Sequence, residues 1–282
     1  MTADEVRTAV ERPGPILNSG LAATLAEVGW RRLRPFGISE ENYSTMRALL
    51  GDPSPRCVLV TRVPIPNSDA LIQLEMFPDG IPTAYSDLGM KPARAGPERI
   101  SRALFFGLRE LATVPAALAP VERLARSLHP LNVDDPQVDV SYSDPEVPFS
   151  VFLGIHEREV RDEPLRLAEA VLHETMHLQL SLIEDVVPLV SDATERWSSP
   201  WQGRPRPAQG VLHGLYVFRA VEEFLQARRA CGLDGADDRY VERRLRTIAE
   251  EIAEAAAVVA SADLTDTGRA LASRLVAARF DA

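Results

Sequence analysis

The sequence has few of the features that mark secreted, membrane-bound or nucleic-acid-binding proteins. Its two cysteines, Cys57 and Cys231, form no CxxC pair and cannot build a disulfide framework. The first twelve residues are polar and charged, and no apolar run approaches the ~20 residues that span a bilayer. We therefore expect a soluble, cytoplasmic chain that has no membrane partner.

Basic charge is scarce as well. The chain carries 31 Lys and Arg against 41 Asp and Glu, a formal net charge of −10. This charge repels phosphate backbones, and no basic stripe with interleaved aromatic residues offsets it. The composition therefore predicts no nucleic-acid partner. It leaves the oligomeric state unknown.

The chain is long and apolar enough to bury a substantial core. It has 282 residues, of which 45% are hydrophobic, and no internal repeat or low-complexity tract marks a linker. We predict a single domain over 1–282, with a mixed α/β portion at 1–155 and a helical portion at 156–282.

The order of the patterns predicts an α+β fold that is predominantly helical. β-rich runs separated by turn residues predict a small antiparallel sheet in the first half, at 57–63, 70–77, 138–142 and 149–153. Helical spacing indicates helices at 17–33, 97–111 and 120–128, and then a helical bundle in the second half at 164–187, 209–230, 237–261 and 266–279.

The strongest chemical signal is an H-E-x-x-H motif within the first helix of that bundle, where Glu174 follows His173 and precedes His177 by three residues. Four residues advance a helix by about 400°, so the two imidazoles lie one turn apart on the same face. Both can bind one cation at about 2.1 Å. Glu174 can reach the outer shell of the metal, where a zinc peptidase uses such a residue as general base.

Accident is a poor explanation for this motif. With five histidines and 41 acidic residues, the expected number of H-[DE]-x-x-H matches is roughly 0.01. The other interpretation is structural, because apolar neighbours such as Leu172 and Leu178 indicate a buried helix. In that case the two histidines would be core residues whose hydrogen bonds go to backbone carbonyls.

A catalytic metal usually has three protein ligands. His213 is the best candidate for the third, because it opens an apolar helix 36 residues after His177 and is followed by Gly214, which would ease close approach. A carboxylate, Glu222 or Glu223, is the alternative. The remaining histidines, His129 and His156, stand in polar surroundings, and we predict surface or loop positions for both.

A proline-rich loop separates the two candidate metal helices and carries Arg204 and Arg206. Its prolines stiffen it, so that it can present an arginine at little entropic cost. An arginine can bind a carboxylate with two parallel hydrogen bonds. A surface loop whose tryptophans cover the core is an equally good interpretation.

Three segments resemble the α-ketoglutarate-HExxH-type peptide β-hydroxylases, HExxH-motif proteins found beside ribosomally made peptide natural products. They are Leu172–Leu178, Ser199–Pro207 with its Pro-Trp and Arg-Pro steps, and Gly210–Phe218 with its Leu-His-Gly step. A fourth segment, Ser141–Pro145, resembles the family more weakly. Together they cover about the middle third of the chain, and their order is more telling than the HExxH motif alone.

This resemblance implies Fe(II) held by His173, His177 and His213, with α-ketoglutarate as cosubstrate and a precursor peptide as substrate. It makes Arg206 the first candidate for binding the cosubstrate carboxylate. The sequence departs from the family pattern at Gln202 and Arg204, which leaves Arg204 open for that role. Imidazole suits iron and zinc alike, so the ligands alone do not choose the metal.

Three functions therefore compete. The first is an Fe(II)/α-ketoglutarate-dependent hydroxylase that acts on the β-carbon of a peptide residue. The second is a zinc metallopeptidase with Glu174 as general base. The third is a non-catalytic peptide-binding protein with a degenerate metal site. The identity of the peptide and of its modified residue does not follow from the sequence.

Overall fold

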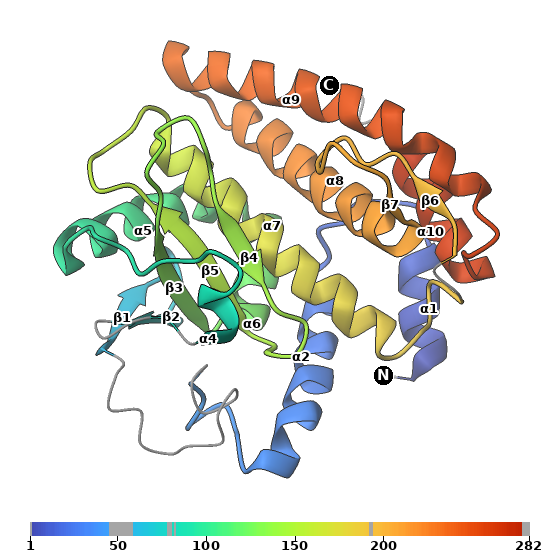
Figure 1. Cartoon of the computed structure of the whole chain (residues 1–282), viewed down its shortest axis with the longest axis horizontal. Helices are drawn as coiled ribbons and strands as arrows, with labels where there is room; N and C mark the ends of the chain where they lie inside the picture. Colours follow the sequence, from blue (N-terminus) through green and yellow to red (C-terminus); the bar gives the residue numbers. More distant parts are fainter. Residues whose placement is uncertain (1, 45–58, 78–80, 82, 192–193, 278–282) are drawn as a thin grey trace.

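The computed structural model describes residues 2–44, 59–77, 81, 83–191 and 194–277. Within them the chain forms a five-stranded sheet and a set of helices that cover it and extend beyond it (Figure 1). The first half contains α1 (Ala3–Glu11), α2 (Ser19–Leu33), η1 (Arg34–Phe36), β1 (Leu59–Pro64), β2 (Leu71–Met76), α4 (Thr83–Ser86), α5 (Pro97–Ala112), α6 (Pro115–Leu124), β3 (Ser127–Asn132), β4 (Ser141–Ser143) and β5 (Ser150–Ile155).

The second half is helical except for one short ladder. It contains α7 (Glu163–Glu184), β6 (Arg196–Trp197), β7 (Arg206–Pro207), α8 (Ala208–Ala230), α9 (Gly235–Ala255), η2 (Ala256–Ala260) and α10 (Asp266–Ala277). The predicted α+β, predominantly helical fold is thus confirmed. Among the described residues, no helix combines the length and the hydropathy that a bilayer-spanning segment requires.

The prediction of a purely antiparallel sheet was wrong, because the sheet is mixed. Its order is β1-β2-β3-β5-β4, and β3 runs parallel to both of its neighbours while the two outer pairs are antiparallel. The central strand β3 lies at 127–132, in a region where the sequence indicated the end of a helix at 120–128. That helix, α6, ends at Leu124.

The composition of β3 explains why it was missed. Five of its six residues are buried, so its sequence lacks the alternation of a half-exposed strand. It also contains Pro130, which normally argues against a central strand. The ladder with β2 pairs only Ser127 and Leu128 of β3, so Pro130 lies beyond the end of that ladder.

Helix α7 is the element that joins the two halves. It packs against the sheet at β4 and β5, against α5 and α6, and against α8 on its other side. Pro164 occupies its first turn, where a missing amide costs nothing. At Gly107 a Cβ atom would lie 2.9 Å from Cβ of Leu167, so the absence of a side chain there allows α5 to approach α7 closely.

One apolar cluster extends through both portions of the chain. It includes Val6 of α1, Leu128 of β3, Leu172 of α7 and Leu271 of α10. A second, smaller cluster around Phe77 and Phe152 lies on the other face of the sheet. α7, which will carry the site, is therefore held by buried contacts on several sides.

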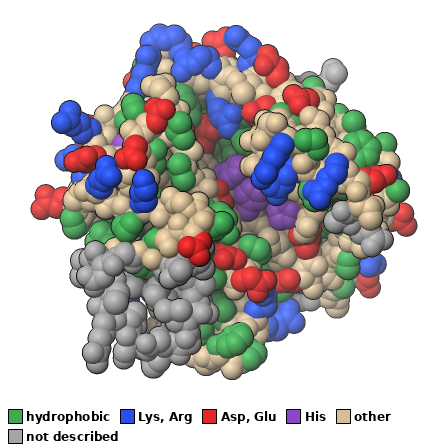
Figure 2. Space-filling view, in the orientation of Figure 1, with side chains coloured by type: hydrophobic (Ala, Val, Ile, Leu, Met, Phe, Trp, Pro, Cys, Tyr) green, Lys and Arg blue, Asp and Glu red, His purple; other side chains and the backbone are tan. Residues whose placement is uncertain are grey.

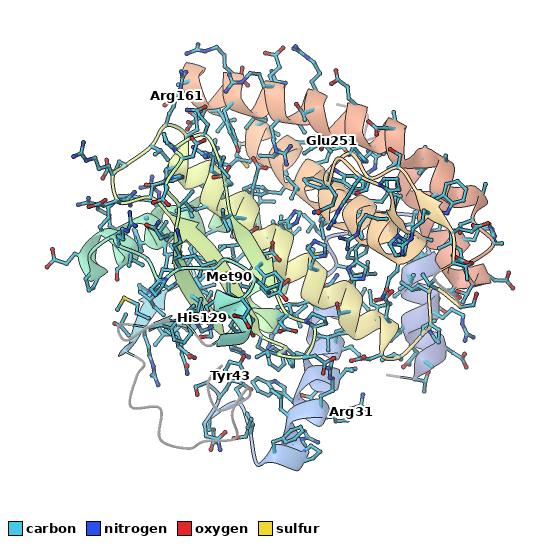
Figure 3. All side chains as sticks on the ribbon, viewed as in Figure 1. Arg31, Tyr43, Met90, His129, Arg161 and Glu251 are labelled. Carbon is cyan, nitrogen blue, oxygen red and sulfur yellow. The ribbon has the colours of Figure 1, made fainter. Side chains whose placement is uncertain are left out.

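The prediction of a surface or loop position was wrong for His129, which is a buried strand residue, whereas His156 does lie in a loop, although it is buried there. His129 belongs to β3 (Figure 3), is fully buried and stacks between Phe77 and Phe152, with ring centroids 5.2 and 4.5 Å away. His156 directly follows β5 and is 7% exposed. Burial lowers the pKa of His129 to about 3, so its ring is neutral at physiological pH.

This burial predicts a specific pH dependence of stability. The unfolded state binds a proton on His129 below pH ~6.5, whereas the folded state does so only near pH 3. The contribution of His129 to stability is therefore present above pH ~6.5 and is lost as the pH falls toward 3, at up to about 1.4 kcal/mol per pH unit.

The variant His129→Leu should remove this slope. Chemical unfolding between pH 4 and 7 should show a free energy of unfolding that depends less steeply on pH in the variant than in the parent protein. Equal slopes in the two proteins would contradict the assignment of a neutral, buried imidazole at this position.

Candidate metal centre

The H-E-x-x-H segment lies in the middle of α7 and presents both histidines to a cleft of about 780 Å³. The Nε2 atoms of His173 and His177 are 3.2 Å apart. Two donors at this separation, each about 2.1 Å from one cation, subtend an angle of roughly 100° at that cation. This value lies between those of octahedral and tetrahedral coordination, so the pair is spaced for one metal ion.

His213 joins this pair from the first turns of α8. Its Nδ1 atom lies 3.2 Å from Nδ1 of His177, and the two rings are nearly parallel, with centroids 5.4 Å apart. The three predicted ligands are therefore neighbours in space. Figure 2 shows histidine side chains together in the hollow between the two halves of the molecule, with basic side chains beside them.

The three histidines form a chain of contacts with His177 in the centre. His177 meets His173 through Nε2 and His213 through Nδ1. Within the described part of the chain, no three His, Cys, Asp or Glu side chains gather their donor atoms around one point as a bound metal requires.

A half-turn of one ring would change this geometry. Rotating the His177 ring by 180° about its Cβ–Cγ bond keeps the ring in its plane and exchanges Nε2 with Cε1. Cε1 lies between the two ring nitrogens, which face His173 and His213. Nε2 would then face the space between His173 and His213. What fits a metal is the chemistry of the donor set, three neighbouring imidazoles, because imidazole nitrogens are common metal ligands.

The electrostatics of the site favour the ligand form of the rings. Burial, and secondarily the charge of Arg244, lowers the pKa of His173 to about 4. Burial also lowers the pKa of His177 well below its usual value, and the neighbouring His173 and His213 add to this effect. Both rings are thus neutral at physiological pH, and a neutral imidazole can bind a metal without first losing a proton.

Glu184, which the sequence did not single out, orients the ring of His213. Nε2 of His213 donates to a carboxylate oxygen of Glu184 at 3.0 Å, and the amide of Gln209 donates to the same oxygen at 3.1 Å. With its proton on Nε2, His213 turns an unprotonated Nδ1 toward His177. The sequence signal for this role is weak: Glu184 stands seven residues, or two helical turns, after His177.

Glu174 is buried at the inner wall of the cleft, 3.9 Å from Nε2 of His173. The hydroxyl groups of Ser141 and Ser143 on β4 donate to its two carboxylate oxygens at 2.6 and 2.7 Å. Burial raises the pKa of Glu174 to about 7, and these two hydrogen bonds oppose that shift. The second residue of the motif therefore ties α7 to the edge of the sheet.

The loop before α8 forms the opposite wall, where β6 and β7 make a two-residue ladder. Trp201 stacks on Phe218 with a centroid distance of 5.2 Å, and its indole donates to Glu251 at 3.1 Å. Gly214 makes this possible, since a Cβ there would lie 2.2 Å from the Trp201 ring. Gly214 thus makes room for Trp201, whereas the sequence predicted that it eases close approach at His213.

The structure separates the two candidate arginines of this loop. Arg206 lines the cleft and packs over Gly210, where a Cβ would lie 3.1 Å from its Nε. Its guanidinium has no hydrogen-bond or ion-pair partner within the described ranges. Arg204 is exposed and does not line the cleft.

The carboxylates considered as alternative third ligands point elsewhere. Glu223 accepts hydrogen bonds from the backbone amides of Ile16 and Leu17 at 2.6 and 3.0 Å. Glu222 pairs with Arg219, three residues earlier on α8. Neither lines the cleft with the histidines, so His213 is the residue of α8 that the fold brings to the motif.

Replacing His213 should abolish tight metal binding if it completes the site. In His213→Ala, titration with Co(II) or Zn(II) should give an affinity reduced by more than the roughly 10- to 100-fold that loss of an outer-shell partner costs. His129→Leu, which changes a buried histidine that does not line the cleft, is the control and should bind as the parent does. Unchanged metal stoichiometry and affinity in His213→Ala would exclude His213 as a ligand.

Removing the partner of His213 should have a smaller effect. Glu184→Ala should weaken metal binding by about 10- to 100-fold because the ring loses its orienting acceptor. Asp185→Ala is the matched control, since Asp185 lines the same cleft but pairs with Arg32 at 3.0 Å. If Glu184→Ala and Asp185→Ala bind the metal equally well, Glu184 does not orient the ligand.

Comparison with known proteins adds no family to this geometry. No protein-family model matches the chain, and no curated protein matches its sequence. The evidence for a function therefore lies in the residues of the cleft.

Proposed function

We propose that this chain is an Fe(II)/α-ketoglutarate-dependent hydroxylase that acts on the β-carbon of a residue in a ribosomally made peptide. In the overall reaction, the peptide C–H bond becomes C–OH, O₂ supplies the oxygen, and α-ketoglutarate is converted to succinate and CO₂. The observation that carries the proposal is Arg206, which lies in the same cleft as three imidazoles and has no ion-pair partner among the described residues.

An α-keto dicarboxylic acid has two different ends. Its distal carboxylate can be bound by a guanidinium, and its keto-acid end can be bound by a metal that imidazoles hold. His173, His177 and His213 would hold the iron, which would supply the oxidation chemistry when bound. Arg206 binds the distal carboxylate of α-ketoglutarate with paired hydrogen bonds and so orients the cosubstrate. Because no acid of the described ranges pairs with Arg206, its guanidinium is available to a bound carboxylate.

The cleft residues also keep water away from this chemistry. Trp201 and Phe218 form an apolar stack beside the histidines, and Phe218 meets His173 edge-on with centroids 5.0 Å apart. Glu174 stays anchored to Ser141 and Ser143, so that it shapes the wall of the cleft and leaves the metal to the imidazoles.

A zinc metallopeptidase is the second candidate, and one observation favours it. Glu174 lines the cleft and lies 3.9 Å from Nε2 of His173, within reach of a metal-bound water. One observation weighs against it: both oxygens of Glu174 already accept hydrogen bonds from Ser141 and Ser143.

The two candidates differ in their requirements. The hydroxylase should form succinate from α-ketoglutarate only with Fe(II) and O₂, and faster when a cognate peptide is present. Anaerobic Fe(II) protein should gain a visible charge-transfer band on addition of α-ketoglutarate. Peptide cleavage with Zn(II) in the absence of oxygen, lost in Glu174→Gln, would support the peptidase instead.

Arg206 and Arg204 provide a matched pair of variants. Arg206→Ala should raise the KM for α-ketoglutarate by about 100-fold, because a charge-assisted, two-point contact contributes roughly 3 kcal/mol. Arg204→Ala removes an exposed arginine of the same loop and should leave this KM unchanged. Steady-state succinate formation gives the KM of each variant. Equal KM values in the two variants would show that Arg206 does not bind the carboxylate of α-ketoglutarate.

A further inference from the structure

The strand beside the histidines, β4, is the edge of the sheet. It pairs only with β5, in antiparallel register, with Ser141 opposite Leu153 and Ser143 opposite Val151. The amide of Gly154 donates to the carbonyl of Val140 at 2.6 Å, so residues 140 and 154 form a hydrogen-bonded pair. Such pairs alternate along an antiparallel ladder.

This alternation decides where the backbone of β4 points. Tyr142, two residues after Val140, directs its N–H and C=O toward β5. Ser141 and Ser143 direct theirs away from β5, toward the open edge. Within the described part of the chain, no backbone or side-chain group bonds to these outward amides and carbonyls.

The open edge of β4 faces two clefts that meet at the histidines. The first is the cleft of the candidate metal centre, which all three residues of β4 line. The second, of about 820 Å³, is lined by Pro136, Gln137, Asp139 and Ser141 on one side and by α9 on the other. The two share Ser141, His173 and Phe218, so they adjoin at the edge strand, and we call them together the groove.

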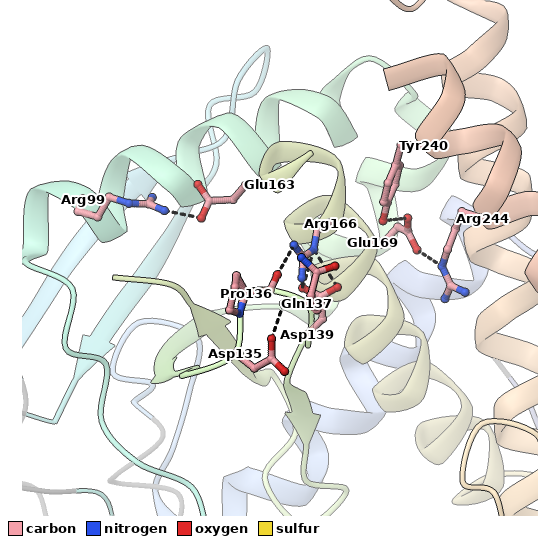
Figure 4. Close-up of polar contacts among 10 residues, drawn as sticks. All are labelled: Arg99, Asp135, Pro136, Gln137, Asp139, Glu163, Arg166, Glu169, Tyr240 and Arg244. Carbon is pink, nitrogen blue, oxygen red and sulfur yellow. Dashed lines mark hydrogen bonds and ion pairs between the residues drawn. The ribbon is translucent and has the colours of Figure 1, made fainter. Parts of the chain in front are cut away.

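This edge is held rigidly. Ser141 and Ser143 are bonded to Glu174 of α7 through their hydroxyl groups. Arg166 of α7 donates to both carboxylate oxygens of Asp139 and to the carbonyl of Pro136 (Figure 4). The backbone groups that face the groove are thus preorganised, which lowers the entropic cost of binding a partner.

Most arginines of the second cleft lie beside carboxylates of the protein itself. Glu169 is bonded to Tyr240 at 2.6 Å and to Arg244 at 2.8 Å (Figure 4). Each arginine that lines this cleft has an acidic neighbour within 4 Å: Arg166 has Asp139, Arg244 has Glu169, and Arg161 and Arg243 share Asp162. This arrangement favours recognition through neutral backbone groups.

We propose that an extended segment of the peptide substrate pairs with the open edge of β4 and adds a strand to the sheet. Its identity as a substrate rests on the function proposed above. Backbone hydrogen bonds to Ser141 and Ser143 hold the segment, and a strand about 4.8 Å from β4 lies along the groove past the histidines. β4 itself has three residues, Ser141 to Ser143, and so spans roughly 10 Å, which pairs with about three residues of the segment.

In strand addition, the backbone and the side chains of the peptide have separate roles. The backbone supplies affinity with little regard to sequence, and the side chains at alternate positions point to one face of the sheet. Because α7 lies against β4 on one face, every second side chain of the segment turns toward His173 and His177. The residue to be modified is then selected by its position along the strand.

The test compares two substitutions at one position. Ser143→Ala and Ser143→Pro both lose the hydroxyl that contacts Glu174, but only the proline removes the outward N–H. Edge strands tolerate proline at such a position, and the pairing of β4 with β5 needs no amide from residue 143. Thermal melting of the two variants checks that both are folded.

A displayed library of random twelve-residue peptides, selected on the metal-free parent protein, supplies the probe. The enriched peptide should bind Ser143→Pro at least about tenfold more weakly than Ser143→Ala, as expected for the loss of one hydrogen bond in a dry groove. Single N-methylation along the peptide backbone should weaken binding at alternate positions only. Equal affinities of the two variants, an N-methyl scan without alternation, or a library that yields no binding peptide would overturn the proposal.

These measurements use no iron, α-ketoglutarate or oxygen, so they are independent of the hydroxylase assay. If the N-methyl scan alternates but no succinate forms, strand addition is supported and the hydroxylase function is contradicted. Peptide hydroxylation by Ser143→Pro with the KM of Ser143→Ala would leave the hydroxylase in place and remove strand addition.

Discussion

The packing of α7 between the sheet and α8 is the constraint on which the rest of the structure depends. α7 contacts β4 and β5 on one side and α8 on the other, and its buried residues extend from Glu163 to Ile183. The cleft-facing stripe of α7 is the part that these contacts leave accessible. His173 and His177 lie on that stripe, and the α7–α8 contact brings His213 beside them.

Burial of polar groups has a different consequence at each position. Around His173 and His177 it keeps the imidazoles neutral, as a metal site requires. At Glu174 burial raises the pKa of the carboxyl group. Two serine hydroxyls from β4 oppose this shift and hold the carboxylate between helix and sheet. Arg206, by contrast, lines the cleft, and no acidic residue in the described part of the chain pairs with it. The cleft thus combines neutral donors, an anchored acid and an available cation.

The position of β4 links the fold to the proposed substrate. An unpaired edge strand is normally a liability because it can pair with other chains. Here the edge is short, it borders a groove, and it is bonded to the same helix that carries the histidines. A peptide bound there would therefore be placed relative to the candidate metal centre by the sheet itself, with no need for a recognition motif in its side chains.

The sequence alone determined the local features of this protein. Periodic apolar residues and boundary prolines identified α7, α8, α9 and α10, because helices follow from spacing within one segment. The four-residue spacing of His173 and His177 likewise defines their relative position, since both stand on one helix. The order of the mixed elements was enough for the α+β class.

The tertiary structure decided everything that depends on contacts between distant segments. It revealed β3 as the central parallel strand, because a strand buried on both faces has no alternating pattern, and it placed His129 inside the sheet. It gave Arg206 rather than Arg204 access to the cleft, paired Glu184 with His213, and left the edge of β4 open. Residues far apart along the chain carry no mutual signal in a single sequence. Their meeting is set by how the buried faces of α7, α8 and the sheet fit together.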